Sequence, residues 1–196
     1  MQPHHGHALG EHAQLLEVLL CTATNNLRPF LRLSHGLRLL VCVLSHHEEV
    51  IADPDGLALL DRACNILCYL TYHHSDAGAA FVAADGVCVI SRLAGAAHAH
   101  YTRTLARPGT ALPHRPPPEG PSALWDSLTG NVAELISNVS SSQAEAQRAF
   151  ASGGALRALL DMVPLLTALG VGFNSQRRMG AAQPALTFVT EQLLLS

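Results

Sequence analysis

The sequence predicts an all-α protein built from stacked helical units, and three observations support this. The chain repeats its own apolar pattern, because residues 63–93 align without gaps with residues 132–162 (an offset of 69) and with residues 13–43 (an offset of 50). Apolar residues recur at helical spacing inside each copy, and the sustained alternation of a half-buried strand is absent. Self-similarity of this kind is typical of helical-repeat architectures.

The central copy predicts three consecutive helices. The first spans residues 59–71, and its apolar stripe at i, i+3, i+4 and i+7 consists of Ala63, Ile66, Leu67 and Leu70. A short helix over residues 76–84 then buries Ala80 and Phe81. A turn at residues 84–86 follows, where glycine lets the chain reverse direction without a Cβ clash. The apolar positions of the third helix are Val87, Ile90 and Leu93.

The other two copies repeat this plan. In the downstream copy, Phe150 takes the place of Phe81, and a Gly-Gly pair at residues 153–154 forms the turn. Its short helix begins with Ser142-x-x-Glu145, a capping-box pattern in which each side chain satisfies a free amide at the helix end. In the upstream copy, the third helix carries Leu37, Leu40, Val41 and Leu44.

These elements define the domain organisation. We expect residues 1–10 to be disordered and residues 11–196 to form one domain of stacked helices. Its repeat units span about residues 11–46, 57–100 and 122–169. The connector between the first two units contains Asp53-Pro54-Asp55-Gly56, which has the chemistry of a turn. A final helix over residues 184–195 has one apolar face and closes the stack.

A proline-rich loop, residues 101–121, is inserted between the second and third units. Six of the 11 prolines lie between Pro108 and Pro121, and the insertion explains why the second offset exceeds the first. Within it, Arg115, Pro118 and Pro121 have the spacing R-x-x-P-x-x-P. That spacing suits an SH3 domain, because polyproline II repeats every three residues. A stiff loop in a proline-rich chain is the simpler interpretation.

The composition argues against several classes of protein. A formal net charge of −3 gives no basic footprint, so nucleic acid is not expected as a partner. No run of 18 apolar residues predicts a membrane span. The first residues lack the basic start and apolar core of a signal peptide. The five cysteines lie within apolar helix patterns, which indicates reduced thiols in a cytoplasmic or nuclear protein.

One set of residues resembles a metal site. Cys64 and Cys68 are four residues apart on one helix, and His73 and His74 follow. Because Cys64 aligns with Ala133, a core position, we interpret the thiols as core residues and the paired histidines of the chain as solvated. No P-loop, G-x-S-x-G, G-x-G-x-x-G or H-E-x-x-H pattern occurs. We therefore expect no enzymatic activity, no metal and no cofactor.

Two sequence segments of the third unit resemble the armadillo repeat. Residues 149–163, AFASGGALRALLDMV, match its short helix, glycine turn and G-A-L-x-x-L helix, and residues 133–139, AELISNV, match the small-x-x-Leu-x-Asn-apolar pattern before it. The resemblance covers roughly residues 9–46, 57–97 and 122–165, with HEAT or another α-α stack as the alternative. It implies a right-handed superhelix whose concave surface binds peptides.

The resemblance also implies where a partner would bind. Importin-alpha-like members carry Trp-x-x-x-Asn on the concave helix; the matching positions are Glu134 and Asn138 in unit three, and Asn65 and Tyr69 in unit two. The missing tryptophan argues against an import receptor. Tyrosines and amides still suit peptide recognition. The expected partner-binding residues are Asn65, Tyr69, Tyr72, Asn131, Glu134 and Asn138.

These observations predict a non-enzymatic protein–protein interaction module that binds a partner peptide or helix on its concave face. The alternative is a structural fragment or subunit of a larger helical-repeat assembly, which self-associates through its exposed ends. The mass in solution separates these two hypotheses. A third hypothesis, a metal-binding protein, requires stoichiometric zinc in the purified protein.

Overall fold

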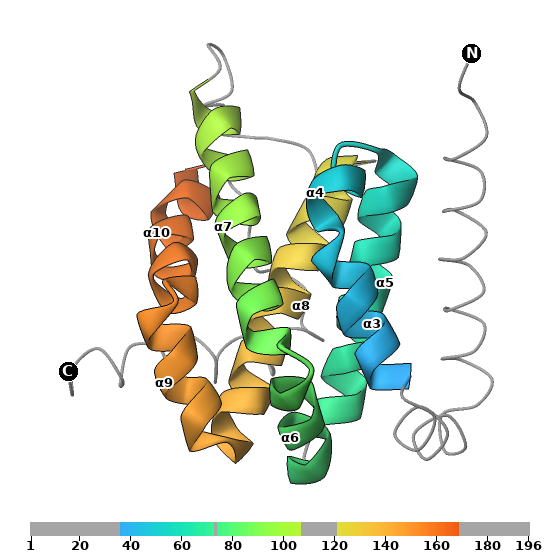
Figure 1. Cartoon of the computed structure of the whole chain (residues 1–196). Helices are drawn as coiled ribbons and strands as arrows, with labels where there is room; N and C mark the ends of the chain where they lie inside the picture. The colour runs from blue at the N-terminus through green and yellow to red at the C-terminus, as the bar shows by residue number, and fades with distance from the viewer. Residues whose placement is uncertain (1–35, 73, 107–120, 169–196) are drawn as a thin grey trace.

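The computed structural model describes residues 36–72, 74–106 and 121–168, and within these ranges the chain is helical with no strand (Figure 1). The described helices are α3 (Gly36–Ser45), α4 (His47–Val50), α5 (Pro54–Thr71), α6 (Ser75–Ala83), α7 (Gly86–Leu105), α8 (Pro121–Ser142), α9 (Ala144–Ser152) and α10 (Ala155–Ala168). The all-α fold class predicted from the sequence is therefore confirmed.

Helices that are equivalent in the two aligned copies are neighbours in the fold. The most extensive helix contacts are those of α5 with α8 and of α7 with α10, and α3 lies against both α5 and α7. In Figure 1, α10, α7 and α3 follow one another across the molecule, and α8 runs behind them. The second sequence offset therefore corresponds to one step from a helix to its equivalent neighbour.

The large aromatic residue of each short helix lies in the core. Phe81 on α6 and Phe150 on α9 are both fully buried, as the alignment predicts. A Cβ at Gly86 would collide with the ring of Phe81, which explains the glycine at the start of α7. The prediction that Ala80 is buried beside Phe81 was wrong. Ala77 is buried instead, because it lies one full turn before Phe81 on the inward face of α6.

The predicted turn at residues 53–56 is in fact the beginning of α5. Asp53 is the N-cap residue, and its carboxylate accepts a hydrogen bond of 3.0 Å from the amide of Gly56. Pro54 takes the first helical position, where its missing amide costs nothing. A Cβ at Gly56 would collide with the carbonyl oxygen of Val50, so glycine allows α4 and α5 to approach closely.

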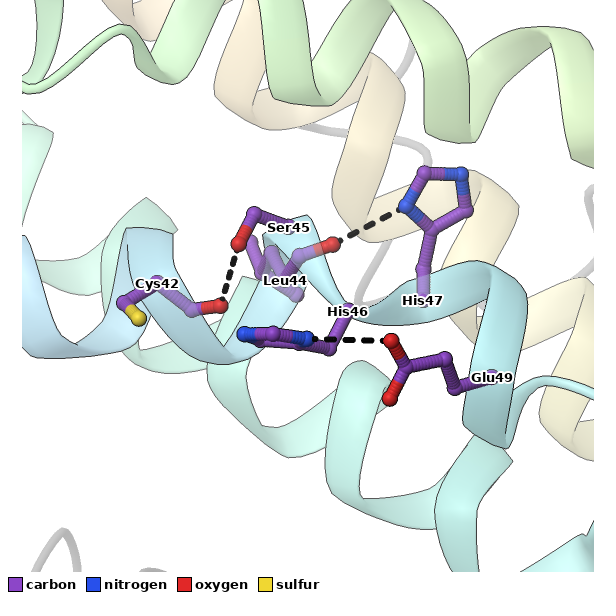
Figure 2. A network of polar contacts seen from close by, with 6 residues as sticks. All are labelled: Cys42, Leu44, Ser45, His46, His47 and Glu49. Atoms are coloured by element: carbon purple, nitrogen blue, oxygen red, sulfur yellow. Dashed lines mark hydrogen bonds and ion pairs between the residues drawn. The ribbon is translucent and has the colours of Figure 1, made fainter.

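The connector before α5 also contains a short helix that was not predicted. Figure 2 shows the α3–α4 junction, where the Ser45 hydroxyl donates to the Cys42 carbonyl at 2.7 Å. His46 Nδ1 lies 3.4 Å from a Glu49 carboxylate oxygen. His47 Nδ1 lies 3.0 Å from the Leu44 carbonyl oxygen, and its side chain is buried. The interpretation of the paired histidines as solvated was therefore wrong for His47.

The inserted loop begins later than predicted, because α7 continues to Leu105. Tyr101 is buried, and its hydroxyl donates a hydrogen bond of 2.7 Å to the carboxylate of Asp126 on α8. One residue earlier, the His100 ring stacks on Trp125 with the ring centroids 4.1 Å apart. Tyr101, which the sequence assigned to the loop, thus belongs to the core. At the other end, Pro121 is the first residue of α8 and not part of the loop.

The predicted capping box at the start of α9 does not form. Ser142 is the last residue of α8, and its hydroxyl donates back to the carbonyls of Asn138 and Val139. The N-cap residue of α9 is Gln143, which makes no side-chain capping bond. Its side-chain amide nitrogen, Nε2, instead donates a hydrogen bond of 2.8 Å to the Ser75 carbonyl. This bond joins the third unit to α6.

Several predictions lie outside the described residues. These are the disordered segment 1–10, the first unit before α3, His73, most of the proline-rich loop with Arg115 and Pro118, and the final helix at 184–195.

Among the described helices, none is by itself long and apolar enough to cross a membrane. Only α6 and α7 taken together satisfy that criterion, and they are bent by 81° relative to each other.

Candidate protein-interaction surface

The predicted binding residues of α5 lie along its most open stripe. Between Gly56 and Thr71, the residues that are not fully buried are Ala58, Arg62, Asn65 and Tyr69. They recur at i, i+4, i+7 and i+11, so they share one helix face. Tyr72 continues this stripe just beyond the helix and is 51% exposed. The other faces of α5 are buried in the core.

The stripe continues only in part on the neighbouring helix α8. Glu134 and Asn138 are half-buried, and Ser141 is exposed. Asn131, by contrast, is 4% exposed. The prediction placed Asn131 on the binding surface, but the structure places it inside the stack. On α8 the stripe therefore begins at Glu134.

Asn131 is a structural contact between the two units. Its side-chain amide nitrogen donates to the Asp61 carboxylate at 2.8 Å and reaches the Asp61 carbonyl at 3.4 Å. Asp61 is itself buried. A buried carboxylate needs hydrogen-bond donors to offset the loss of water, and Asn131 supplies one. The side chain of Asn131 is thus required as a hydrogen-bond donor inside the stack.

Asn138 makes a second contact of the same kind one heptad further along. Its amide nitrogen donates to the Cys68 carbonyl at 3.2 Å, while the Cys68 thiol donates to the Asn131 carbonyl at 3.1 Å. Both asparagine bonds join residues that are 70 positions apart. Since the repeat offset is 69, these bonds link equivalent helices of adjacent units. They hold α5 and α8 in a fixed register.

Two of the residues that resemble a metal site, Cys64 and Cys68, lie in the core. Cys64 and Cys68 are fully buried, and burial is the main reason that the pKa of each thiol is raised well above its ordinary value. The charge of Glu134 raises the pKa of Cys68 further. Such thiols stay protonated at neutral pH, whereas metal binding requires thiolates. His74 lies apart, at the N-cap of α6, and no metal-holding group of three or more ligands occurs among the described residues.

Comparison with models of protein families, with curated proteins and with solved structures finds no match to this chain. The described residues define an all-helical protein with two adjacent copies of a long–short–long helix unit. Any statement about function therefore depends on the surface itself.

Proposed function

We propose that this chain is a non-enzymatic protein–protein interaction module that binds a partner peptide or helix along α5 and α8. We further propose that its units stack in the armadillo manner as a right-handed superhelix. The observation that carries the proposal is the open stripe of α5. Asn65, Tyr69 and Tyr72 lie along it, while the other faces of the helix are buried from Gly56 onward.

The chemistry of this stripe suits protein recognition. Tyrosine presents a large, rigid apolar ring and a polar hydroxyl, and it is enriched at the centres of interfaces. Tyr72 is the most exposed aromatic residue of the described chain, and Tyr69 lies one turn before it on the same face. Asn65 and Glu134 add polar groups that can fix the orientation of a peptide backbone.

Hydrogen bonds join the two helices beneath the stripe, which favours binding. The hydrogen bonds of Asn131 and Asn138 lock α8 against α5. A preorganised surface loses less conformational entropy when it binds, so more of the contact energy appears as affinity. No cofactor or metal takes part in this function, and neither nucleic acid nor a membrane is its target.

We place the protein in the cytoplasm, with the nucleus as a second compartment. Cys42 and Cys88 are free thiols on the surface, and Cys64 and Cys68 are free thiols in the core. Persistent thiols of this kind suit a reducing compartment.

A second candidate function is a structural subunit whose ends stack on other repeats. It is favoured by α10, which packs on α7 and α9 and carries the half-buried leucines Leu159, Leu160 and Leu165. Incomplete burial of leucines on the last of the described helices is expected where another helix can pack. Analytical ultracentrifugation separates the candidates, because a stacking subunit assembles as its concentration rises while a binding module stays monomeric.

Affinity capture tests the first proposal. The immobilised full chain is compared with Tyr69→Ala/Tyr72→Ala and with the control Leu39→Ala, which removes a second large apolar side chain that is exposed among the described residues. The proposal expects a protein that the parent and Leu39→Ala capture and the tyrosine variant loses. It is contradicted if every captured protein binds all three chains equally while their melting temperatures agree.

A further inference from the structure

A pocket of about 490 Å³ lies where the α6–α7 turn meets α9. Its apolar wall includes Val82 and Val87 from the second unit and Ala146 and Ala149 from the third. Neither the pocket nor any of its residues belongs to the stripe on α5 and α8. The pocket therefore forms a second candidate site at the junction of the two units.

Three charged side chains line this pocket without neutralising one another. Asp85, Arg92 and Glu145 all contribute to its wall. Asp85 is the N-cap residue of α7, yet it has a left-handed backbone (φ 62°) and makes no side-chain capping bond. In the described part of the chain, no hydrogen bond or ion pair engages the side chain of Asp85, Arg92 or Glu145.

This arrangement selects for a cation that also carries apolar atoms. Two carboxylates outnumber one guanidinium, so the pocket attracts positive charge. Arginine combines an apolar stem with a charged head that bonds carboxylates in a planar, two-pronged geometry. The stem can lie along the valine and alanine wall while the head reaches Asp85 or Glu145.

The chain itself carries such a group within reach. Between residues 169 and 190, the only charged residues are Arg177 and Arg178, and apolar Met179 follows them. The pocket borders Gly153, just before α10, and the 14 residues of α10 span roughly 21 Å. The nine residues from Ala168 to Arg177 can span roughly 30 Å when extended. The arginine pair can therefore return along α10 to the pocket.

We propose that this pocket is the binding site for Arg177 and Arg178 of the chain's own C-terminal segment. Exposed charge pairs are individually weak. The covalent tether compensates for this, because a short linker within one chain gives an effective concentration in the millimolar range. This contact lies at the junction of the second and third units, on a surface separate from the proposed partner-binding stripe.

The native cysteines provide a reporter for this contact. Cys88 lines the pocket and is exposed, whereas Cys42 is exposed on α3, away from the pocket. The rate at which a maleimide modifies each thiol is measured by peptide mass spectrometry in the full chain and in Arg177→Glu/Arg178→Glu. We expect Cys88 to react about fivefold faster in the variant, since opening the pocket removes weak surface pairs. The rate at Cys42 should not change.

A second variant acts from the other side of the contact. Asp85→Asn/Glu145→Gln keeps the side-chain shapes, and asparagine tolerates the left-handed backbone at residue 85. It should raise the rate of maleimide modification at Cys88 as the arginine variant does. Combining both variants should not raise that rate any further. A salt concentration of 1 M should act in the same direction, because it screens charges beyond about 3 Å.

Equal Cys88 rates in the parent and in both variants would overturn the proposal. Protection that grows with protein concentration would also overturn it, because the occupant would then be a second copy of the chain. Matching melting temperatures establish that the variants are folded. Since the tyrosine stripe lies elsewhere, partner capture by the arginine variant shows separately whether the proposed function holds.

Discussion

Asn131 on α8 donates a hydrogen bond of 2.8 Å to the buried carboxylate of Asp61 on α5, 70 residues earlier in the chain. The bond joins equivalent helices of two repeat units, and Asn138 repeats the pattern at the Cys68 carbonyl. Residues that the sequence suggested for partner binding thus hold the stack together.

Replacing Asn131 should destabilise the fold without touching the binding surface. Asn131→Ala leaves the Asp61 carboxylate buried and without this donor, so the free energy of unfolding should fall by about 1–3 kcal/mol. The matched control is Asn65→Ala, a half-buried amide on α5, which should stay within about 0.5 kcal/mol of the parent. Urea denaturation measures both. Equal midpoints for the two variants would contradict the role assigned to Asn131.

Truncating either of the two equivalent phenylalanines should also destabilise the fold. Phe81 and Phe150 are fully buried at equivalent positions, so truncating either to alanine should cost about 3–5 kcal/mol. Leu39→Ala, at a residue that is 66% exposed, is the control and should leave the melting temperature nearly unchanged. If both phenylalanine variants melt like the parent, the repeat register described for α6 and α9 is wrong.

The proline-rich insertion should be dispensable only outside the helices. Deleting residues 108–119 should leave the fold intact, because halving the length of a connecting segment changes the free energy of loop closure by only about 0.6 kcal/mol. A deletion that begins at Tyr101 removes the hydrogen bond to Asp126 and the last turn of α7, so it should destabilise the protein. Circular dichroism melts of both deletions test this. An insoluble or molten 108–119 deletion would place the insertion in the core.

The buried thiols predict a loss of stability in alkali. Burial raises the pKa of Cys64 and Cys68 above the ordinary value of 9.0, so the folded chain retains protons that the unfolded chain releases. Their contribution to stability is therefore fully present below about pH 9 and declines as the pH rises above it, by at most about 1.4 kcal/mol per pH unit for each thiol. Urea midpoints measured from pH 8 to 10.5 report this decline.

The control for that experiment removes the thiols. Cys64→Ala/Cys68→Ala should flatten the alkaline decline, although it lowers the overall stability. Cys42→Ser, at an exposed thiol, should leave the decline as it is. An alkaline decline of equal slope in all three chains would assign it to other groups and contradict the prediction.

Much of the fold could be predicted because helical periodicity is a local signal. The predicted helices 59–71 and 76–84 correspond to α5 and α6, and the aligned phenylalanines identify the core of both units. Helix ends were predicted less well. Asp53-Pro54-Asp55-Gly56 suits a turn and a helix N-terminus equally, and only the Asp53 capping bond decides between them.

The candidate site was harder to predict, because it depends on how helices are placed beside one another. The spacing of Asn65, Tyr69 and Tyr72 correctly gave one shared face, since that spacing is a property of a single helix. Whether Asn131 faces a partner or α5 depends on the register between two helices. A signal did exist, because Asp61 and Asn131 are separated by almost the repeat offset.

The measurement that tests the proposed function most directly is a titration of the captured partner against three chains: the parent, Tyr69→Ala/Tyr72→Ala and the control Leu39→Ala. Tyrosine hot spots contribute about 2 kcal/mol or more when truncated, so the tyrosine variant should bind roughly 30-fold more weakly or worse. Its helical content should match that of the parent, and Leu39→Ala should bind normally. Unchanged affinity in a folded tyrosine variant would contradict binding on this face.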